Sequence, residues 1–225
     1  MTVGIITFFK SYNYGVWLQA VATQEFFSKN GFNAEIINYT NELEDSKTKY
    51  AYKENDKIYG YATSFIKSIL FGKVKYYKKG FLKYLNSYYK ISKKEYHNVD
   101  NMQDIKYDIL VAGSDQLWNP ETTSGVLDRA FLLKFGNARK RISVATSIGS
   151  VPVEKKNEKI IMDALEDFDA ISVREQYAKD ELHRFCNLPI KVIMDPTFLL
   201  NKKEWIELAK KNTNMKKSNK KYILT

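Results

Sequence analysis

Short apolar runs alternate with amphipathic segments along this chain. Residues 3–9 are apolar, and the polar, turn-prone run 11–15 follows them, which predicts a buried strand and then a loop. Apolar residues at helical spacing then predict a helix that ends near Asn30 and Gly31, and residues 34–39 read as a second strand. Together these segments form a β-α-β unit, which is typical of a parallel sheet.

The same alternation returns in the second half of the chain. Asn201 and Glu204 there fit a variant of the capping box, with Trp205 and Leu208 on the apolar side of the helix that follows. The pattern therefore predicts an α/β fold with a Rossmann-like parallel sheet and flanking helices. The further predicted strands are residues 107–112, 141–146, 170–173 and 190–194, and the further predicted helices are residues 154–168, 175–185 and 201 to about 212.

Two lysine-rich regions interrupt this rhythm. Residues 44–106 lack strong strand signals, and within them residues 73–94 hold eight lysines and no acid, with apolar residues at the spacing of an amphipathic helix. Residues 210–221 read as a linker that leads into a strand. We therefore expect one lobe over residues 1–212, with a helical insertion at about 44–106, and the linker and first strand of an absent C-terminal lobe over residues 213–225.

Composition narrows the class of protein. With 44% hydrophobic residues the chain can bury a sizeable core, and the net charge of 36 − 26 = +10 favours anionic partners such as phosphorylated metabolites, nucleic acid or an acidic membrane surface. Cys186 is the only cysteine, which excludes an internal disulfide and a thiolate zinc site. There is no basic n-region at the start and no apolar stretch near the ~20 residues of a membrane span, so we expect a cytoplasmic protein.

Small, polar or charged residues collect after five predicted strands. Ligands of open parallel sheets bind at the carboxyl ends of the strands, so these residues predict a cleft there, with one rim shared by the segments around Asn13, Ser114, Ser147, Arg174 and Asp195. The full candidate set is Asn13, Tyr14, Gly15, Gly113, Ser114, Asp115, Gln116, Trp118, Asn119, Ser147, Gly149, Arg174, Glu175, Asp195 and Thr197.

Each candidate also has a purely structural interpretation. Glycines permit tight turns, Ser and Asp cap helices, an Arg-Glu pair can be a surface ion pair, Asp-Pro-Thr can be a turn, and Trp118 suits a core. His97 and His183 lie in charged surroundings and read as surface residues. GxGxxG, GxxxxGK[ST], HExxH and GxSxG are all absent, which removes support for dinucleotide, P-loop, zinc-protease and hydrolase sites.

Taken together, the segments resemble the polysaccharide pyruvyl transferase family. The most specific are the GSDQxWN run at 113–119 and the SVRE run at 172–175, and the departures are Trp17 and Thr146. The matching segments, which span about 200 residues, are 4–8 (GIITF), 13–15 (NYG), 18–20 (LQA), 107–119 (YDILVAGSDQLWN), 143–149 (SVATSIG), 168–175 (FDAISVRE) and 195–200 (DPTFLL).

The resemblance implies a two-lobed, GT-B-like transferase with its site between the lobes. Such an enzyme transfers the pyruvyl group of phosphoenolpyruvate to a sugar as a ketal, on units of bacterial capsular polysaccharide, exopolysaccharide or cell-wall glycan. Phosphoenolpyruvate is a co-substrate, and neither a cofactor nor a metal is expected. The family's second lobe carries further basic residues, including a histidine, so we expect the 225-residue chain alone to be nearly inactive and to self-associate through exposed apolar surface.

Chemistry suggests roles for the candidates. Arg174 suits the carboxylate or phosphate of phosphoenolpyruvate, and Asp115 or Glu175 suits a general base toward a sugar hydroxyl. The side-chain amides of Asn13, Gln116 and Asn119 suit hydrogen bonding to a sugar, and the remaining candidates would complete the substrate-binding rim.

Two other functions remain open from the residues alone. One is a GT-B-like glycosyltransferase with a nucleotide-sugar donor, and the other is a non-catalytic basic protein that binds nucleic acid through the lysines and tyrosines of residues 73–94. No RNP, zinc-finger or helix-turn-helix pattern supports the second. The same lysines could instead face a lipid-linked glycan acceptor, or the inner face of an anionic membrane to which the protein would bind peripherally.

Overall fold

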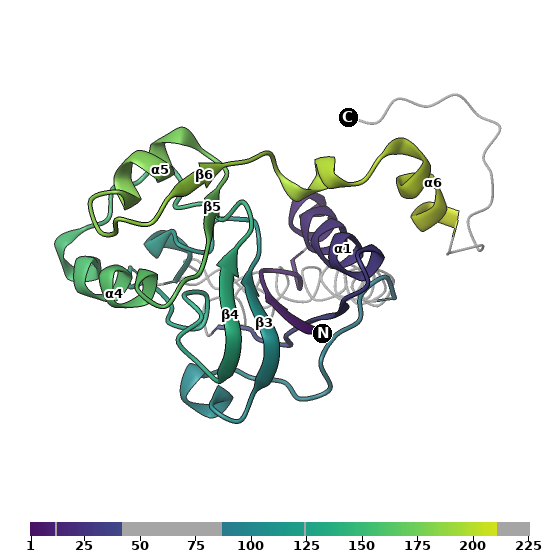
Figure 1. The fold of residues 1–225 in the computed structure, drawn as a ribbon, viewed down its shortest axis with the longest axis horizontal. Coiled ribbons are helices and arrows are strands. Elements are labelled where there is room, and N and C mark those ends of the chain that lie inside the picture. Colours follow the sequence, from purple (N-terminus) through teal and green to yellow (C-terminus); the bar gives the residue numbers. More distant parts are fainter. Residues whose placement is uncertain (12, 42–86, 124, 211–225) are drawn as a thin grey trace, which may run out of the picture.

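The computed structural model describes residues 1–11, 13–41, 87–123 and 125–210 (Figure 1). The strands are β1 (Thr2–Ile6), β2 (Asn33–Ile36), β3 (Lys106–Ala112), β4 (Asn137–Ser143), β5 (Ile171–Val173) and β6 (Ile190–Val192). The α-helices are α1 (Tyr14–Lys29), α4 (Lys155–Leu165), α5 (Gln176–Leu182) and α6 (Lys202–Lys210). Three 3₁₀ turns are η1 (Val99–Met102), η2 (Pro120–Thr123) and η3 (Pro196–Leu199).

The strands form a parallel sheet, as the sequence pattern predicts. Four strands pair in the order β2-β1-β3-β4, and β5 pairs with β6 in a second, two-stranded parallel sheet. Backbone bonds from Ser143 N to Ala170 O and from Thr146 N to Ser172 O join the end of β4 to β5. The predicted Rossmann-like α/β fold is confirmed.

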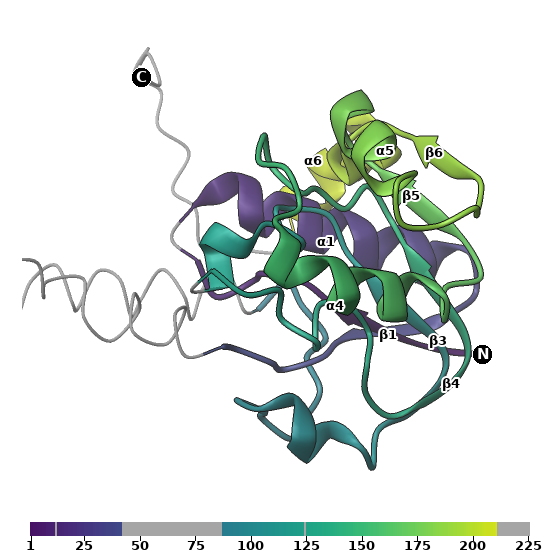
Figure 2. The ribbon, with the colours of Figure 1, turned by 90° about the vertical axis from the view of Figure 1, so that its left-hand side faces the viewer.

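Both faces of the central strands β1 and β3 are largely buried, which explains why these two strands read as continuous apolar runs, whereas the edge strand β4 is mostly exposed or half-buried. On β3, Ile109 and Val111 pack with Phe27 of α1, whereas Leu110 and Ala112 pack in the cluster that includes Ile161 of α4. The two views agree that α1 and α4 cover opposite faces (Figures 1 and 2). Because side chains alternate between the two faces along each strand, they contribute to two separate core layers.

The strand order places a switch point between β1 and β3. From β1 the chain moves to β2 on one side, and from β3 it moves to β4 on the other. The crevice outside the carboxyl ends of two such strands is the usual ligand position in open α/β sheets. The loops after Ile6 and after Ala112 start at this crevice.

The helix α6 returns the chain to α1. Leu208 and Leu200 are buried in one cluster with Phe9 and Ala20, and half-buried Trp205 packs against it. The capping box is confirmed, because Asn201 Oδ1 accepts hydrogen bonds from the N–H groups of Lys203 and Glu204, and Glu204 Oε2 accepts one from Asn201 N. The 3₁₀ turn η3, just before this helix, is thereby held against α1.

Some expected boundaries were wrong. The strand predicted over residues 141–146 begins at Asn137 and ends at Ser143, because Ala145 adopts a φ of 52°, which no regular strand accommodates. Of the amphipathic helix predicted over residues 73–94, the described residues 87–94 form a turn and an extended segment, in which Ile91 pairs with Ile36. The free hydrogen-bonding edge of β2 pairs with this segment, and that pairing outweighs the tendency of its apolar spacing to form a helix.

Other expectations fall on residues that the structure does not describe. The rest of the insertion, residues 44–86, and the linker and strand expected over residues 213–225 lie outside the described residues. The domain division at residue 212 therefore stays a prediction. Among the described residues, no helix combines the length and the apolar character that a membrane crossing requires.

Candidate active site

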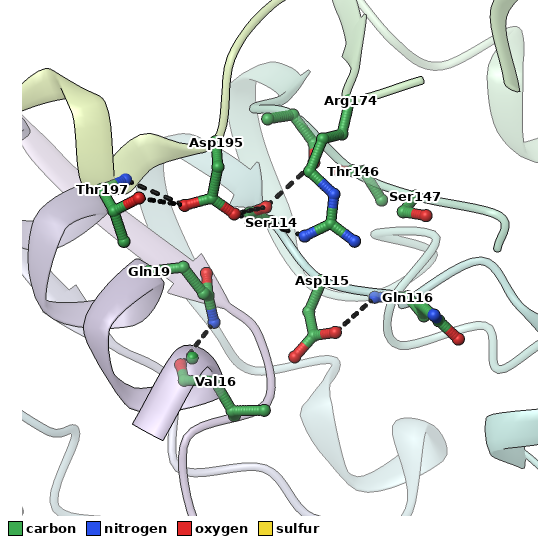
Figure 3. Close-up of polar contacts among 12 residues, drawn as sticks. Val16, Gln19, Ser114, Asp115, Gln116, Thr146, Ser147, Arg174, Asp195 and Thr197 are labelled. Atoms are coloured by element: carbon green, nitrogen blue, oxygen red, sulfur yellow. Dashed lines mark hydrogen bonds and ion pairs between the residues drawn. The ribbon is translucent and has the colours of Figure 1, made fainter. Parts of the chain in front are cut away.

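A cavity of about 380 Å³ lies at the carboxyl edge of the sheet. Its wall combines the loop after β1 and the first turns of α1 with the loop after β3, the residue after β5 and the start of η3 (Figure 3). The lining residues are Asn13, Gly15, Val16, Leu18, Gln19, Asp115, Arg174, Asp195 and Thr197. Six of them belong to the candidates taken from the sequence.

Arg174 is held in place by two carboxylates. Its Nε donates to Glu175 Oε1 at 2.8 Å and its Nη1 to Asp195 Oδ2 at 3.3 Å, and its side chain stays 30% exposed. Burial lowers the pKa of Arg174, but the hydrogen bonds and charges of Glu175 and Asp195 outweigh burial, so the pKa lies above its usual value. The guanidinium is therefore a fixed cation at the cavity wall.

Asp195 connects three segments of this wall. Its Oδ1 accepts from the backbone N of Thr197 at 2.9 Å and from the Thr197 hydroxyl at 2.8 Å, which caps η3. Its Oδ2 lies 3.3 Å from both Arg174 Nη1 and Ser114 Oγ. Ser147, whose backbone N donates to Asp115 O at 2.9 Å, adjoins the same segments, so the five strand ends share one rim, as expected.

Asp115 adopts a conformation that is rare for its residue type. Its φ is 93°, and its Oδ1 accepts a hydrogen bond from Gln116 N at 2.8 Å. Burial raises the pKa of the Asp115 carboxyl above its usual range, although the Gln116 N–H and the Arg174 charge oppose this shift. Backbone strain and a perturbed carboxyl in one cavity are features that cluster at functional sites.

The N-terminus of α1 contributes partial positive charge. Asn13 is the N-cap, with its Oδ1 accepting from Gly15 N at 2.8 Å, and a Cβ added at Gly15 would lie 3.2 Å from that oxygen. The first N–H groups of a helix have no intrahelical partner, and the helix dipole is positive at this end. Tyr14, the third candidate of this segment, is exposed and lies outside the cavity lining.

Several candidates build the loop behind Asp115 instead of lining the cavity. Gln116 Oε1 accepts from Asn119 Nδ2 at 2.9 Å, and Asn119 Oδ1 accepts from Glu121 N at 3.0 Å, so these amides bond within the loop. Ser147 Oγ accepts from Gly149 N at 2.9 Å. These hydrogen bonds hold the loop in one shape and thereby aim Asp115 at the cavity.

Three further candidates serve the packing or the orientation of other residues and do not line the cavity. Trp118 has no exposed surface, and its Nε1 donates to Phe131 O at 2.9 Å, so it belongs to the core and not to the substrate-binding rim. Gly113 is required for packing, because an added Cβ would lie 2.8 Å from Thr7 Cβ. Glu175 is not part of the cavity lining, and the hydrogen bond that its Oε1 accepts from Arg174 links it to the site.

The sequence candidates omitted three lining residues, all on the first turns of α1. Val16 and Leu18 read as ordinary apolar helix residues. Gln19 is only 2% exposed, and a glutamine beside Ala20 on the buried side of a helix was the available signal. Within the described ranges, no group of three or more His, Cys, Asp or Glu side chains is placed to hold a metal ion, and His97 and His183 are exposed.

Comparison with known proteins gives a family for this chain. The family model described as "Polysaccharide pyruvyl transferase" matches residues 13–224. Comparison with curated proteins and with solved structures found no match for either. The matched range contains all nine residues that line the cavity and covers nearly the whole sequence. The chain therefore belongs to the polysaccharide pyruvyl transferase family.

Proposed function

We propose that the cavity is part of the site that transfers the pyruvyl group of phosphoenolpyruvate to a sugar, forming a ketal. The observation that carries the proposal is that a fixed cation, Arg174, and a carboxyl, Asp115, line one cavity at the switch point of a chain in this family. A volume of about 380 Å³ lies within the range of small-molecule sites. The acceptor would be a sugar unit of a glycan, free or lipid-linked.

The reaction has simple requirements. The methylene carbon of phosphoenolpyruvate takes up a proton, and the neighbouring carbon becomes electrophilic. Two sugar hydroxyls add to that carbon, the C–O bond to phosphate breaks, and inorganic phosphate leaves. The two hydroxyl protons account for the balance: one replaces the proton that the methylene carbon took up to become a methyl group, and the other leaves with the phosphate. The site therefore needs cations for the carboxylate and phosphate, and a base for a hydroxyl.

The residues of the cavity match these requirements. The Arg174 guanidinium has further N–H donors beyond the two that bind Glu175 and Asp195, and guanidinium groups bind carboxylate and phosphate in a fork. The N-terminus of α1, whose first residues also line the cavity, adds partial positive charge. Asp115, the carboxyl with the raised pKa, is the general base in this proposal, whereas Glu175 serves to orient Arg174.

Family membership favours this function over the nucleotide-sugar transferase and the nucleic-acid-binding protein. The test is a titration of the 225-residue protein with phosphoenolpyruvate, UDP-glucose and a random oligonucleotide, followed by saturation-transfer NMR and calorimetry. We expect phosphoenolpyruvate to bind and inorganic phosphate to compete with it, because both use the same cation. Binding of UDP-glucose without binding of phosphoenolpyruvate would contradict the proposal and support a glycosyltransferase.

A further inference from the structure

Gln19 has a buried acceptor with no donor in the described part of the chain. The residue is 2% exposed and lines the cavity, and its Oε1 is buried without a hydrogen-bond partner. In Figure 3 this oxygen points away from Val16, toward the side of the cavity where Asp195 and Thr197 lie. A buried polar atom that lacks a partner costs free energy, so native folds rarely leave one without a reason.

The orientation of the Gln19 amide is fixed by its other end. Its Nε2 lies 2.8 Å from Val16 O, 3.0 Å from Thr7 Oγ1 and 3.1 Å from Phe8 O. Rotation of the amide by 180° would place Oε1 against two carbonyl oxygens, and repulsion excludes that arrangement. The Thr7 hydroxyl donates to Ser114 O at 2.9 Å, so it accepts from Gln19.

A second glutamine on the same helix shows what a structural role looks like. Gln24 is 5% exposed, its Oε1 accepts from Lys90 N at 2.9 Å, and its Nε2 donates to Lys90 O at 2.7 Å. Both polar ends of Gln24 are therefore used within the chain. Gln19 uses only its donor end, and its acceptor oxygen is left without a partner beside the cavity that the residue lines.

The chemistry of a ligand at this acceptor follows from its surroundings. Gln19 Oε1 and the carboxylate oxygens of Asp115 and Asp195 all belong to residues of the lining, and each of these atoms can only act as a hydrogen-bond acceptor when the carboxylates are ionised. Phosphoenolpyruvate, whose phosphate has its second pKa at about 6, is mostly the trianion near neutral pH and in that form has no N–H or O–H to donate, whereas a sugar offers several hydroxyl donors. An unpaired acceptor such as Gln19 Oε1 therefore suits a hydroxyl of a polyol, and it does not suit an oxygen of a multiply charged anion, which needs a donor or a cation such as Arg174.

We infer that Gln19 is a specificity-determining residue of the acceptor-sugar subsite, whose Oε1 accepts a hydrogen bond from a sugar hydroxyl. This inference rests on the proposed function for the identity of the second substrate. It assigns Gln19 to the sugar and the Arg174 guanidinium to phosphoenolpyruvate, within the one cavity that both residues line. A hydroxyl held by Gln19 lies in the cavity that also holds the proposed base.

The test compares Gln19→Met with the matched control Gln24→Met, both in the full 225-residue chain, after circular dichroism has verified folding. The probes are the methyl α-pyranosides of glucose, galactose and mannose, and phosphoenolpyruvate, with dissociation constants from saturation-transfer NMR. We expect Gln19→Met to weaken binding of the preferred pyranoside by about tenfold or more. Gln24→Met should leave pyranoside binding unchanged, and both variants should still bind phosphoenolpyruvate.

The outcomes separate the two proposals. Equal pyranoside affinity of wild type and Gln19→Met, or no pyranoside binding by wild type, would overturn the inference. Loss of phosphoenolpyruvate binding alone in Gln19→Met would also overturn it, because Gln19 would then serve the other substrate. If wild type binds a pyranoside through Gln19 and does not bind phosphoenolpyruvate, the proposed function fails and the sugar subsite stands.

A measurement on the wild-type protein keeps the inference testable if Gln19→Met does not fold. Each hydroxyl of the preferred pyranoside is replaced in turn by fluorine, which cannot donate a hydrogen bond. A site that requires a hydroxyl donor rejects the analogue that lacks it. We expect one position at which fluorine weakens binding by about tenfold or more. Equal binding of every fluorinated analogue would overturn the inference.

Discussion

Asp195 Oδ2 lies 3.3 Å from Nη1 of Arg174, and the same carboxylate caps η3 through its other oxygen. The guanidinium is thus oriented by a residue that follows a different strand, β6, before any ligand is present. Orientation in advance reduces the conformational entropy that binding would otherwise cost. It also makes Arg174 sensitive to the position of η3, which packs against α1.

Replacement of Arg174 tests the cationic end of the cavity. We expect Arg174→Ala to weaken phosphoenolpyruvate binding by about 2–5 kcal/mol, because a partly buried anion would lose its charge-assisted partner. Calorimetric titration measures the change. Arg184→Ala is the matched control, since Arg184 is an exposed arginine that pairs with Glu181 and Glu158 and does not line the cavity. Equal effects of the two substitutions would refute the assignment of the anion site to Arg174.

Replacement of Asp115 tests the proposed base. Asp115→Asn removes the ionisable group and keeps an oxygen for the Gln116 N–H, and it should lower the turnover number by about 10²–10⁴-fold with little change in phosphoenolpyruvate affinity. Phosphate release in the presence of an acceptor sugar measures turnover. Because burial raises the pKa of Asp115, the wild-type rate should fall with acidification at a pH above the usual carboxyl range. A turnover unchanged by the substitution would exclude Asp115 as the base.

The same substitution should stabilise the fold. The pKa of Asp115 is higher in the folded chain than in the unfolded chain, so the folded state binds this proton more tightly. Its contribution to stability is fully present below the unfolded pKa and is lost as the pH rises through the folded pKa. At neutral pH a neutral Asn avoids this cost, and Asn also tolerates the φ of 93°. We expect a higher melting temperature for Asp115→Asn at pH 7, with the difference shrinking on acidification, as followed by calorimetry.

Replacement of Trp118 separates a core role from a substrate contact. Trp118→Phe leaves Phe131 O without its donor and should reduce the free energy of unfolding by about 1–3 kcal/mol in urea. Binding of phosphoenolpyruvate and of pyranosides should be unchanged below the unfolding transition. Trp205→Phe removes a similar hydrogen bond, to Thr197 O, from a half-buried side chain, and a smaller loss of stability is expected there. A loss of ligand affinity in Trp118→Phe without a loss of stability would show that Trp118 contacts the substrate.

Replacement of Asn201 tests the start of α6. Asn201→Ala removes the oxygen that caps Lys203 and Glu204, and it should reduce the free energy of unfolding by about 1 kcal/mol in urea. Asn187→Ala, at an exposed loop position, is the control and should have little effect. Equal stability of the two variants would mean that the cap contributes nothing measurable to the fold.

Much of the fold could be predicted from the order of apolar and polar residues. Strands buried on both faces read as continuous runs, so β1 and β3 were evident, and Asn30 marked the end of α1. The expected helix over residues 73–94 failed in its described part, because local spacing carries no information about an unpaired strand edge that competes for Ile91. Tertiary pairing there overrides a local preference.

The sequence by itself determined which residues follow the strands, since a parallel sheet brings all its carboxyl ends to one edge. It placed Asn13, Asp115, Arg174 and Asp195 near one another without any knowledge of distances. The sequence could not distinguish the residues that line the cavity from those that hold the surrounding loops in place, because burial and hydrogen-bond direction depend on neighbours distant in the chain. Only the tertiary structure decided between the core and the substrate-binding role of Trp118. It alone left Oε1 of Gln19, a residue of the cavity lining, without a donor among the described residues, since an orphaned acceptor exists only where folded segments meet.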